Sequence, residues 1–159
     1  MPRLYPFRPV IDNRYYLAIG RAIVMWGFLE DEIDSHIMML LAREGSPKLN
    51  DGFPRSFEKK KKLWRKLVKI HFVDEDRDRM NDIIDRAVTA RRERDKFAHG
   101  VFTKGPKGQI SLRTQRPETS AIEHPVSVEA IRRNAQHSSQ LIGELIDLWR
   151  GRGPQTRSS

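Results

Sequence analysis

An arginine and a histidine five positions apart carry the clearest chemical potential in this sequence. Arg94 is followed at once by Asp95, and His99 is followed by Gly100. A guanidinium group keeps its charge and offers paired donors that match the oxygens of a phosphate. A histidine ring titrates closest to neutral pH and can accept or donate a proton. These residue types suit the cleavage of an RNA phosphodiester, because the attacking 2′-hydroxyl loses a proton, the leaving oxygen gains one and the phosphorane needs positive charge.

The residues before this pair predict a helix whose buried face becomes ionic near its end. From Met80 to Val88 the apolar residues lie on one stripe of an α-helix, and the continuation of that stripe falls on Arg91 and Asp95. Desolvating an unpaired charge is costly. The switch therefore favours either a buried ion pair or a functional site. Asp95 shares the side of His99, so it can orient that ring or pair with Arg91.

Two carboxylates earlier in the chain are candidate supporting residues for this site. Glu30 and Asp34 lie one helical turn apart, and we expect them to pair with Arg91 or Arg94. The alternative is that both carboxylates are solvated surface charges. A further alternative is a purely structural network, in which Arg91 is held by carboxylates and His99 only caps the helix.

The run Arg94-Asp95-x-x-x-His99-Gly100 resembles the signature of the HEPN superfamily: an arginine, usually a polar residue next, then a histidine after four to six intervening residues. The resemblance implies an all-α fold, an antiparallel four-helix up-and-down bundle over residues 12–150. It also implies a frequent dimer and the metal-independent ribonuclease activity of toxin or defence systems. Asp95 stands where the family often has asparagine, and it adds negative charge where an RNA phosphate would come. Two other pairs share the spacing, and we interpret them as chance matches: Arg65 with His71, and Arg132 with His137.

A single copy of the motif is not sufficient for this chemistry. One histidine does not readily serve as acid and base in one step, and Arg94 and His99 are about 140° apart around an ideal helix. A two-fold dimer, as the resemblance implies, would bring two copies of the pair together. The hypothesis is therefore a metal-independent endoribonuclease that uses both residues across a dimer interface and needs no cofactor. The alternative is a non-catalytic HEPN-like module that binds nucleic acid or protein, or a dimeric scaffold; an antitoxin-like neutralising protein is a further expected partner.

Composition predicts a single basic domain. The chain has 159 residues, 38% of them hydrophobic and 32% charged, and a formal net charge of +9. These values predict one sizeable core and an anionic partner, with nucleic acid the leading candidate, and the resemblance makes RNA or another polyanion the expected partner. The chain lacks cysteine, which excludes disulfides and thiolate metal sites, and no metal site is expected. No apolar run has the length of a membrane span and Met1–Pro6 lacks an apolar signal core, so we predict a cytoplasmic protein with no membrane partner.

Four amphipathic helices are expected to position these residues. The first begins after Asp12 and runs to about Arg43, and its apolar stripe is wide enough to imply burial against two helices or a second protomer. The others cover residues 57–71, 74–99 and about 128–150. Gly100 is expected to end the third helix in the left-handed conformation.

The remaining segments are short. A small β-hairpin between helices three and four is predicted from residues 101–103 and 109–112, followed by an irregular stretch at 113–125. Residues 1–11 are expected to be an extended N-terminal segment, and residues 151–159 a disordered tail.

Two groups of lysines are candidate phosphate contacts. The second helix begins with a run of four lysines, and the tip of the predicted hairpin carries two more. Closely spaced ammonium groups release counterions when they meet a polyanion. The alternative is a solvated helix face in the first group and a plain surface ribbon in the second. The lysines are Lys59, Lys60, Lys61 and Lys62 in the helix, and Lys104 and Lys107 in the hairpin.

Overall fold

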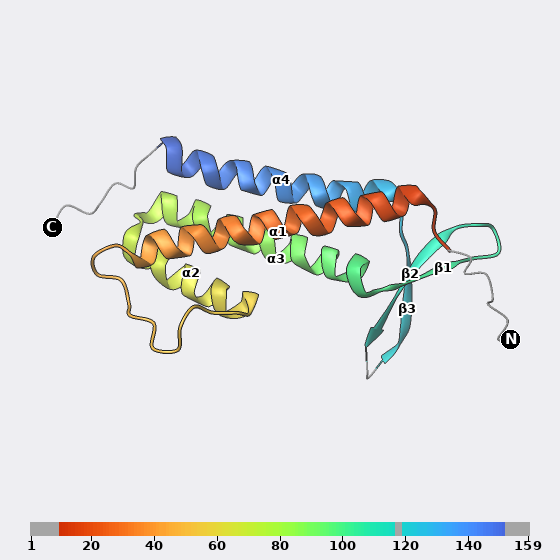
Figure 1. The fold of residues 1–159 in the computed structure, drawn as a ribbon, viewed down its shortest axis with the longest axis horizontal. Coiled ribbons are helices and arrows are strands. Elements are labelled where there is room, and N and C mark those ends of the chain that lie inside the picture. Colours follow the sequence, from red (N-terminus) through yellow and green to blue (C-terminus); the bar gives the residue numbers. More distant parts are fainter. Residues whose placement is uncertain (1–9, 117–118, 152–159) are drawn as a thin grey trace, which may run out of the picture.

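The computed structural model describes residues 10–116 and 119–151, and this part of the chain is mainly helical with one small antiparallel sheet (Figure 1). The four predicted helices are confirmed. The predicted extended segment at residues 1–11 and the predicted tail at 151–159 lie mostly outside the described residues. The helices are α1 (Asn13–Leu41), α2 (Phe57–His71), α3 (Asp74–His99) and α4 (Val128–Gly151), and the strands are β1 (Val101–Lys104), β2 (Ile110–Arg116) and β3 (Thr119–Pro125).

Polar side chains start three of the helices by accepting hydrogen bonds from free backbone N–H groups. The carboxylate of Asp12 accepts from the N–H of Arg14 at 2.9 Å at the start of α1. The hydroxyl of Ser56 accepts from the N–H of Lys59 at 3.4 Å at the start of α2. Ser127 caps α4 in the same way. These are short-range signals, which explains why the sequence predicts the helix limits well.

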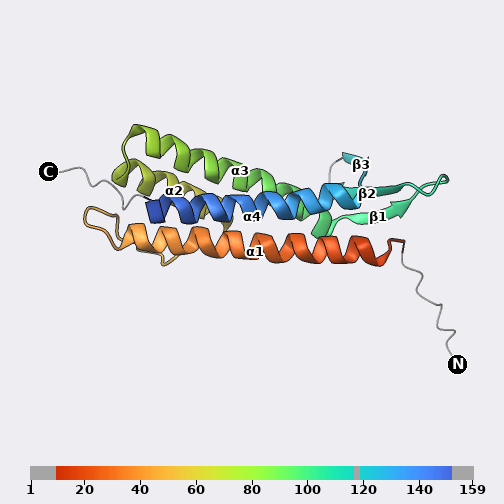
Figure 2. The same ribbon diagram turned by 90° about the horizontal axis from the view of Figure 1, so that it is seen from above.

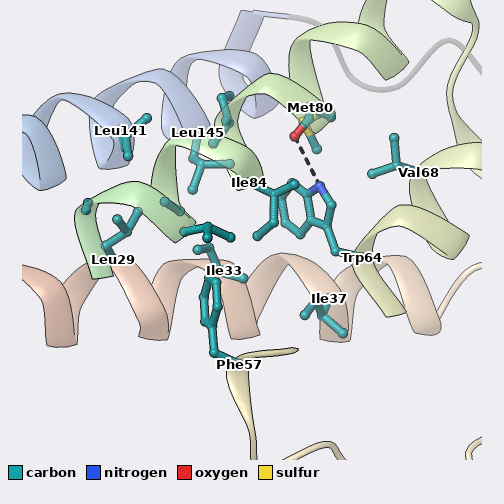
Figure 3. Close-up of a cluster of buried hydrophobic side chains, with 14 of the residues drawn as sticks. Leu29, Ile33, Ile37, Phe57, Trp64, Val68, Met80, Ile84, Leu141 and Leu145 are labelled. Atoms are coloured by element: carbon teal, nitrogen blue, oxygen red, sulfur yellow. Dashed lines mark hydrogen bonds between the residues drawn. The ribbon is translucent and has the colours of Figure 1, made fainter. Parts of the chain in front are cut away.

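The main core lies where all four helices meet. Trp64 of α2 is fully buried, and its indole N–H donates to the carbonyl of Met80 in α3 at 3.1 Å (Figure 3). Ile33 of α1 and Leu145 of α4 are equally inaccessible. Both views show α1 and α4 side by side (Figures 1 and 2), and Figure 2 shows α1 along one edge of the molecule. The inner face of α1 is therefore covered by its own chain.

A second, smaller cluster joins the helices to the sheet. Ala18 and Ala22 of α1, Phe97 of α3 and Ile131 of α4 pack with Leu112 of β2. This cluster connects the end of α3, where the Arg94–His99 motif lies, to the sheet.

The sheet has three strands rather than the predicted two. β1 pairs with β2 and β2 pairs with β3, both antiparallel, with Phe102 opposite Leu112 and Leu112 opposite His124. The prediction of an irregular stretch at residues 113–125 was wrong. The polar composition of this stretch hides its strands, because they are stabilised by backbone pairing with a neighbouring strand rather than by an alternating apolar pattern of their own.

Gly100 ends α3, but not in the predicted conformation. Its φ is −80°, an extended value that any residue adopts, so the left-handed prediction was wrong. A Cβ at this position would lie 2.5 Å from Cδ1 of Leu112 and 2.5 Å from the carbonyl oxygen of Lys96. Glycine is therefore needed here for the close approach of β2, not for a positive φ.

Candidate functional site

Arg94 lies against an aromatic ring of α1. Its guanidinium carbon is 5.4 Å from the centroid of the Trp26 ring, a cation–π contact. Its Nη1 is 3.0 Å from a carboxylate oxygen of Asp95, and the side chain is only 18% exposed. Its Nε is buried and has no hydrogen-bond partner among the described residues. Arg94 is thus half-enclosed, with one donor left unused.

Arg91 makes a parallel set of contacts one turn earlier on α3. Its guanidinium carbon is 5.4 Å from the centroid of Phe57 in α2, and its Nε is 3.5 Å from the other oxygen of Asp95. Two guanidinium groups therefore share a single carboxylate. Of the two roles expected for Asp95, pairing with Arg91 is the one observed, and it extends to Arg94.

The two aromatic rings under these arginines form one unit. Trp26 and Phe57 contact edge to face, with ring centroids 5.2 Å apart. Neither ring was among the candidate site residues predicted from sequence. The sequence did contain a clue: Trp26 lies on the apolar face of the first helix, one turn before Glu30. An aromatic ring was therefore to be expected next to the candidate carboxylates.

Glu30 and Asp34 do not pair with Arg91 or Arg94, so that expectation was wrong. Both carboxylates instead accept hydrogen bonds from the ammonium group of Lys60, Glu30 at 2.9 Å and Asp34 at 2.6 Å. The indole N–H of Trp26 donates to the second oxygen of Glu30 at 3.2 Å. The two carboxylates therefore share one ammonium group, which leaves one negative charge in excess, and Trp26 lies between Glu30 and Arg94.

Lys60 is buried, which corrects its assignment to an exposed phosphate-binding ridge. The spacing of Phe57, Lys60, Trp64 and Leu67 places it on the inner face of α2, a helical pattern that the run of lysines hid. Burial alone would lower the pKa of Lys60, but its hydrogen bonds to Asp34 and Glu30 outweigh burial and raise that pKa. Lys60 therefore serves the fold as the shared partner of two carboxylates in an ion-pair cluster.

The other predicted lysines divide by exposure. Lys59 and Lys62 are exposed, whereas Lys61 is half-buried with its ammonium 3.7 Å from a carboxylate oxygen of Asp85. Lys104 and Lys107 are exposed around the β1–β2 turn, which projects beyond the helices in Figures 1 and 2. None of these five lysines is placed in contact with the arginines of α3.

His99 is the last residue of α3, and its side chain is exposed. Arg94 faces the aromatic rings of α1 and α2, whereas His99 faces solvent, as the angle of about 140° between them requires. A single chain therefore does not bring the two motif residues together. A composite site would need a second copy of the motif.

Comparison with known proteins adds no relative: no protein-family model, curated protein or solved structure matches this chain. Within residues 10–116 and 119–151, no helix has both the length and the apolar character needed to cross a membrane. The same residues contain no group of three or more histidine, aspartate or glutamate side chains arranged to hold a metal ion.

Proposed function

We propose that this protein binds RNA at the Arg91–His99 segment and cleaves it as a metal-independent, HEPN-like endoribonuclease that acts as a dimer. One observation carries the proposal. Arg91 and Arg94 share the carboxylate of Asp95, whereas Glu30 and Asp34 bind Lys60 and not the two arginines. The group Arg91, Arg94 and Asp95 therefore has one positive charge in excess at the end of α3, beside an exposed histidine, and the group Glu30, Asp34 and Lys60 has one negative charge in excess on the other side of Trp26. Four helices around one core agree with the up-and-down bundle that the motif implies.

The chemistry divides between two copies of the motif. Arg94 donates to the phosphate oxygens and stabilises the charge that develops on the phosphorane. His99 of one copy accepts the proton of the 2′-hydroxyl, and His99 of the other protonates the leaving oxygen. Asp95 holds the guanidinium groups of Arg91 and Arg94 in place through its two oxygens.

We further propose a role in a toxin or defence system. An enzyme that cleaves RNA can harm the cell that makes it, so a neutralising protein would be needed to restrain it. The net charge of +9 suits an acidic neutralising protein as antitoxin. Expression of the wild-type chain is expected to slow growth of the host cell, and expression of His99→Ala is expected not to. Equal growth of cells that express the wild type and His99→Ala would contradict the toxin proposal. It would not decide whether the protein cleaves RNA, which the assay described next measures directly.

The direct assay compares RNA cleavage by the wild type, His99→Ala and Arg94→Ala in the presence of a metal chelator. We expect cleavage by the wild type and its loss in both variants, with unchanged helical circular dichroism. His137→Ala is the matched control, because His137 follows Arg132 at the same spacing but lies on α4. Cleavage that requires added metal, or that persists when both motif residues are removed, would contradict the proposal.

A non-catalytic RNA-binding module is the second candidate function. It is favoured by the enclosure of Arg94, whose Nη1 already contacts Asp95 and whose side chain is 18% exposed. In that case RNA binds with an affinity that falls steeply with salt but is not cleaved. His99→Ala then leaves the affinity unchanged, whereas Lys59→Ala and Lys62→Ala weaken it.

A further inference from the structure

The connection between α1 and α2 encloses a hollow that lies outside the candidate site described above. Figure 1 shows this connection, residues 42–56, extending away from the helices before it turns back into α2. The hollow has a volume of about 720 Å³, which is typical of small-molecule sites. It is lined by residues 48–56 of the connection and by Lys59 and Leu63 in the first two turns of α2. Connections of this length without helix or strand are uncommon and usually have a function.

The lining of the hollow has an excess of positive charge. Lys48, Arg55 and Lys59 are exposed, and none of them makes an ion pair with another described residue. Asp51 is the one carboxylate among the lining residues. Two grooves between α3 and α4 differ in this respect, since one is lined by four carboxylates and two arginines and the other by one of each. Of these three cavities, the hollow is the one whose charge suits an anion.

The hollow also has an apolar surface on the side of the core. Phe53 and Leu63 line the hollow, are half-buried and pack against the main core. The ammonium group of Lys60 is 6.0 Å from the centroid of the Phe53 ring, a cation–π contact that helps to hold the ring in place. A nucleobase stacks on an aromatic ring, and a phosphate accepts hydrogen bonds from ammonium and guanidinium groups. The hollow therefore offers both kinds of contact that a nucleotide needs.

The hollow adjoins the arginines of α3. Arg55 lies two residues before Phe57, whose ring centroid is 5.4 Å from the guanidinium carbon of Arg91. Two residues of extended chain span at most about 7 Å. Neighbouring nucleotides of one RNA strand can therefore contact Arg91 and the hollow at the same time.

We propose that the hollow binds a nucleotide, with its phosphate on Lys48, Arg55 and Lys59. Phe53 and Leu63 contact the base of that nucleotide. The assignment of the nucleotide to an RNA substrate rests on the ribonuclease proposal, whereas the binding of a free nucleotide does not. A base that stacks on Phe53 has left the base stack of a duplex, so the substrate class is single-stranded RNA.

Titration calorimetry of the full chain with adenosine 5′-monophosphate tests the site without RNA cleavage. We expect saturable binding that is about tenfold tighter than binding of adenosine or of inorganic phosphate, because each of these makes only part of the contacts. Arg55→Ala and Phe53→Leu are each expected to weaken it about tenfold. Arg132→Ala is the matched control, because Arg132 is an exposed arginine of α4, and it is expected to have no effect. Circular dichroism verifies that each variant is folded.

Three results would overturn the nucleotide site: no binding of adenosine 5′-monophosphate, inorganic phosphate bound equally well, or equal effects of Arg55→Ala and Arg132→Ala. RNA cleavage that depends on His99 but occurs without nucleotide binding would overturn this site and leave the ribonuclease proposal intact. Nucleotide binding that Arg55→Ala weakens, in a protein that cleaves no RNA, would support the site and contradict the ribonuclease proposal. Single-stranded RNA is expected to displace the nucleotide and a duplex is not, so equal displacement by both would refute the single-strand assignment.

Discussion

Lys60 and Arg94 are both linked to Trp26, Arg94 by direct contact with its ring and Lys60 through Glu30, which accepts the indole N–H, and their charged partners differ. Lys60 is 6% exposed and has two carboxylates, Glu30 and Asp34, to itself. Arg94 stacks on Trp26 and shares the single carboxylate of Asp95 with Arg91. In the first cluster the ammonium group is fully compensated and one negative charge is in excess, so Lys60 holds the two carboxylates and stabilises the fold. The second keeps an excess of positive charge, which is the condition for attracting an anionic ligand.

The largest effect that this comparison predicts is on stability, in Lys60→Met. Removal of the ammonium group leaves the half-buried carboxylates of Glu30 and Asp34 unpaired and next to each other. We expect a loss of about 2–4 kcal/mol in the free energy of unfolding, measured with urea. Lys62→Met, at an exposed position of the same helix, is the control and is expected to change stability by less than about 0.5 kcal/mol. Similar stabilities of the two variants would show that the Lys60 cluster does not support the fold.

Arg94→Met is expected to cost less stability than Lys60→Met. Asp95 keeps Arg91 as a partner, and the methionine side chain still covers Trp26. We expect a loss of about 1 kcal/mol in the same urea experiment. A loss as large as that of Lys60→Met would mean that Arg94 belongs to the structural network rather than to a site.

Arg91→Met tests whether the excess positive charge at the end of α3 contributes to RNA binding. It leaves Arg94 and Asp95 as a neutral pair and so converts the open cluster into a compensated one. We expect RNA affinity to fall and its dependence on salt concentration to weaken by about one counterion. Fluorescence anisotropy with a labelled RNA at several salt concentrations measures both quantities.

The control for that experiment is Arg14→Met. Arg14 is paired with Asp12 at 2.7 Å, so it is a compensated arginine at the start of α1. Its replacement is expected to leave the salt dependence unchanged. Equal effects of the two substitutions would show that RNA follows overall charge and not the end of α3.

The smallest expected effect is on how the free energy of unfolding depends on pH, because the pKa of Lys60 differs from that of an exposed lysine. The folded-state pKa of Lys60 is raised above its usual value of 10.5, although burial opposes this, because Asp34 and Glu30 accept its hydrogen bonds. Its contribution to stability is therefore complete below pH 10.5 and is lost as the pH rises through the folded-state pKa. The stability difference between wild type and Lys60→Met should shrink above pH 10.5. A difference independent of pH in that range would argue against a charged Lys60.

The sequence predicts the helices better than the sheet. Asp12, Ser56 and Ser127 act on N–H groups within three residues of themselves, so their effect is visible in a short window of sequence. The third strand, β3, depends on pairing with β2, and its own sequence has no alternating apolar pattern that would predict a strand. Gly100 shows the same limit in part, since a Cβ there would meet Leu112, a residue of another element, as well as the carbonyl of Lys96 in its own helix.

Within the candidate site, sequence reasoning found the charged segment but not the partners of its charges. It placed Arg91, Arg94, Asp95 and His99 at the end of one helix and anticipated that Arg94 and His99 diverge. It assigned Glu30 and Asp34 to the arginines, and it placed Lys60 on the surface because a run of lysines is usually solvated. The helical spacing of Lys60 with Phe57 and Trp64 was the overlooked signal.

The sequence by itself determined the positive charge of the protein, the limits of its four helices and the identity of the motif residues, because these depend on composition and on contacts a few residues long. Only the tertiary structure decided which carboxylate neutralises which cation. That choice depends on distances between α1, α2 and α3, and segments far apart in the chain meet only after folding. The same distances leave Arg91 and Arg94 with one carboxylate between them.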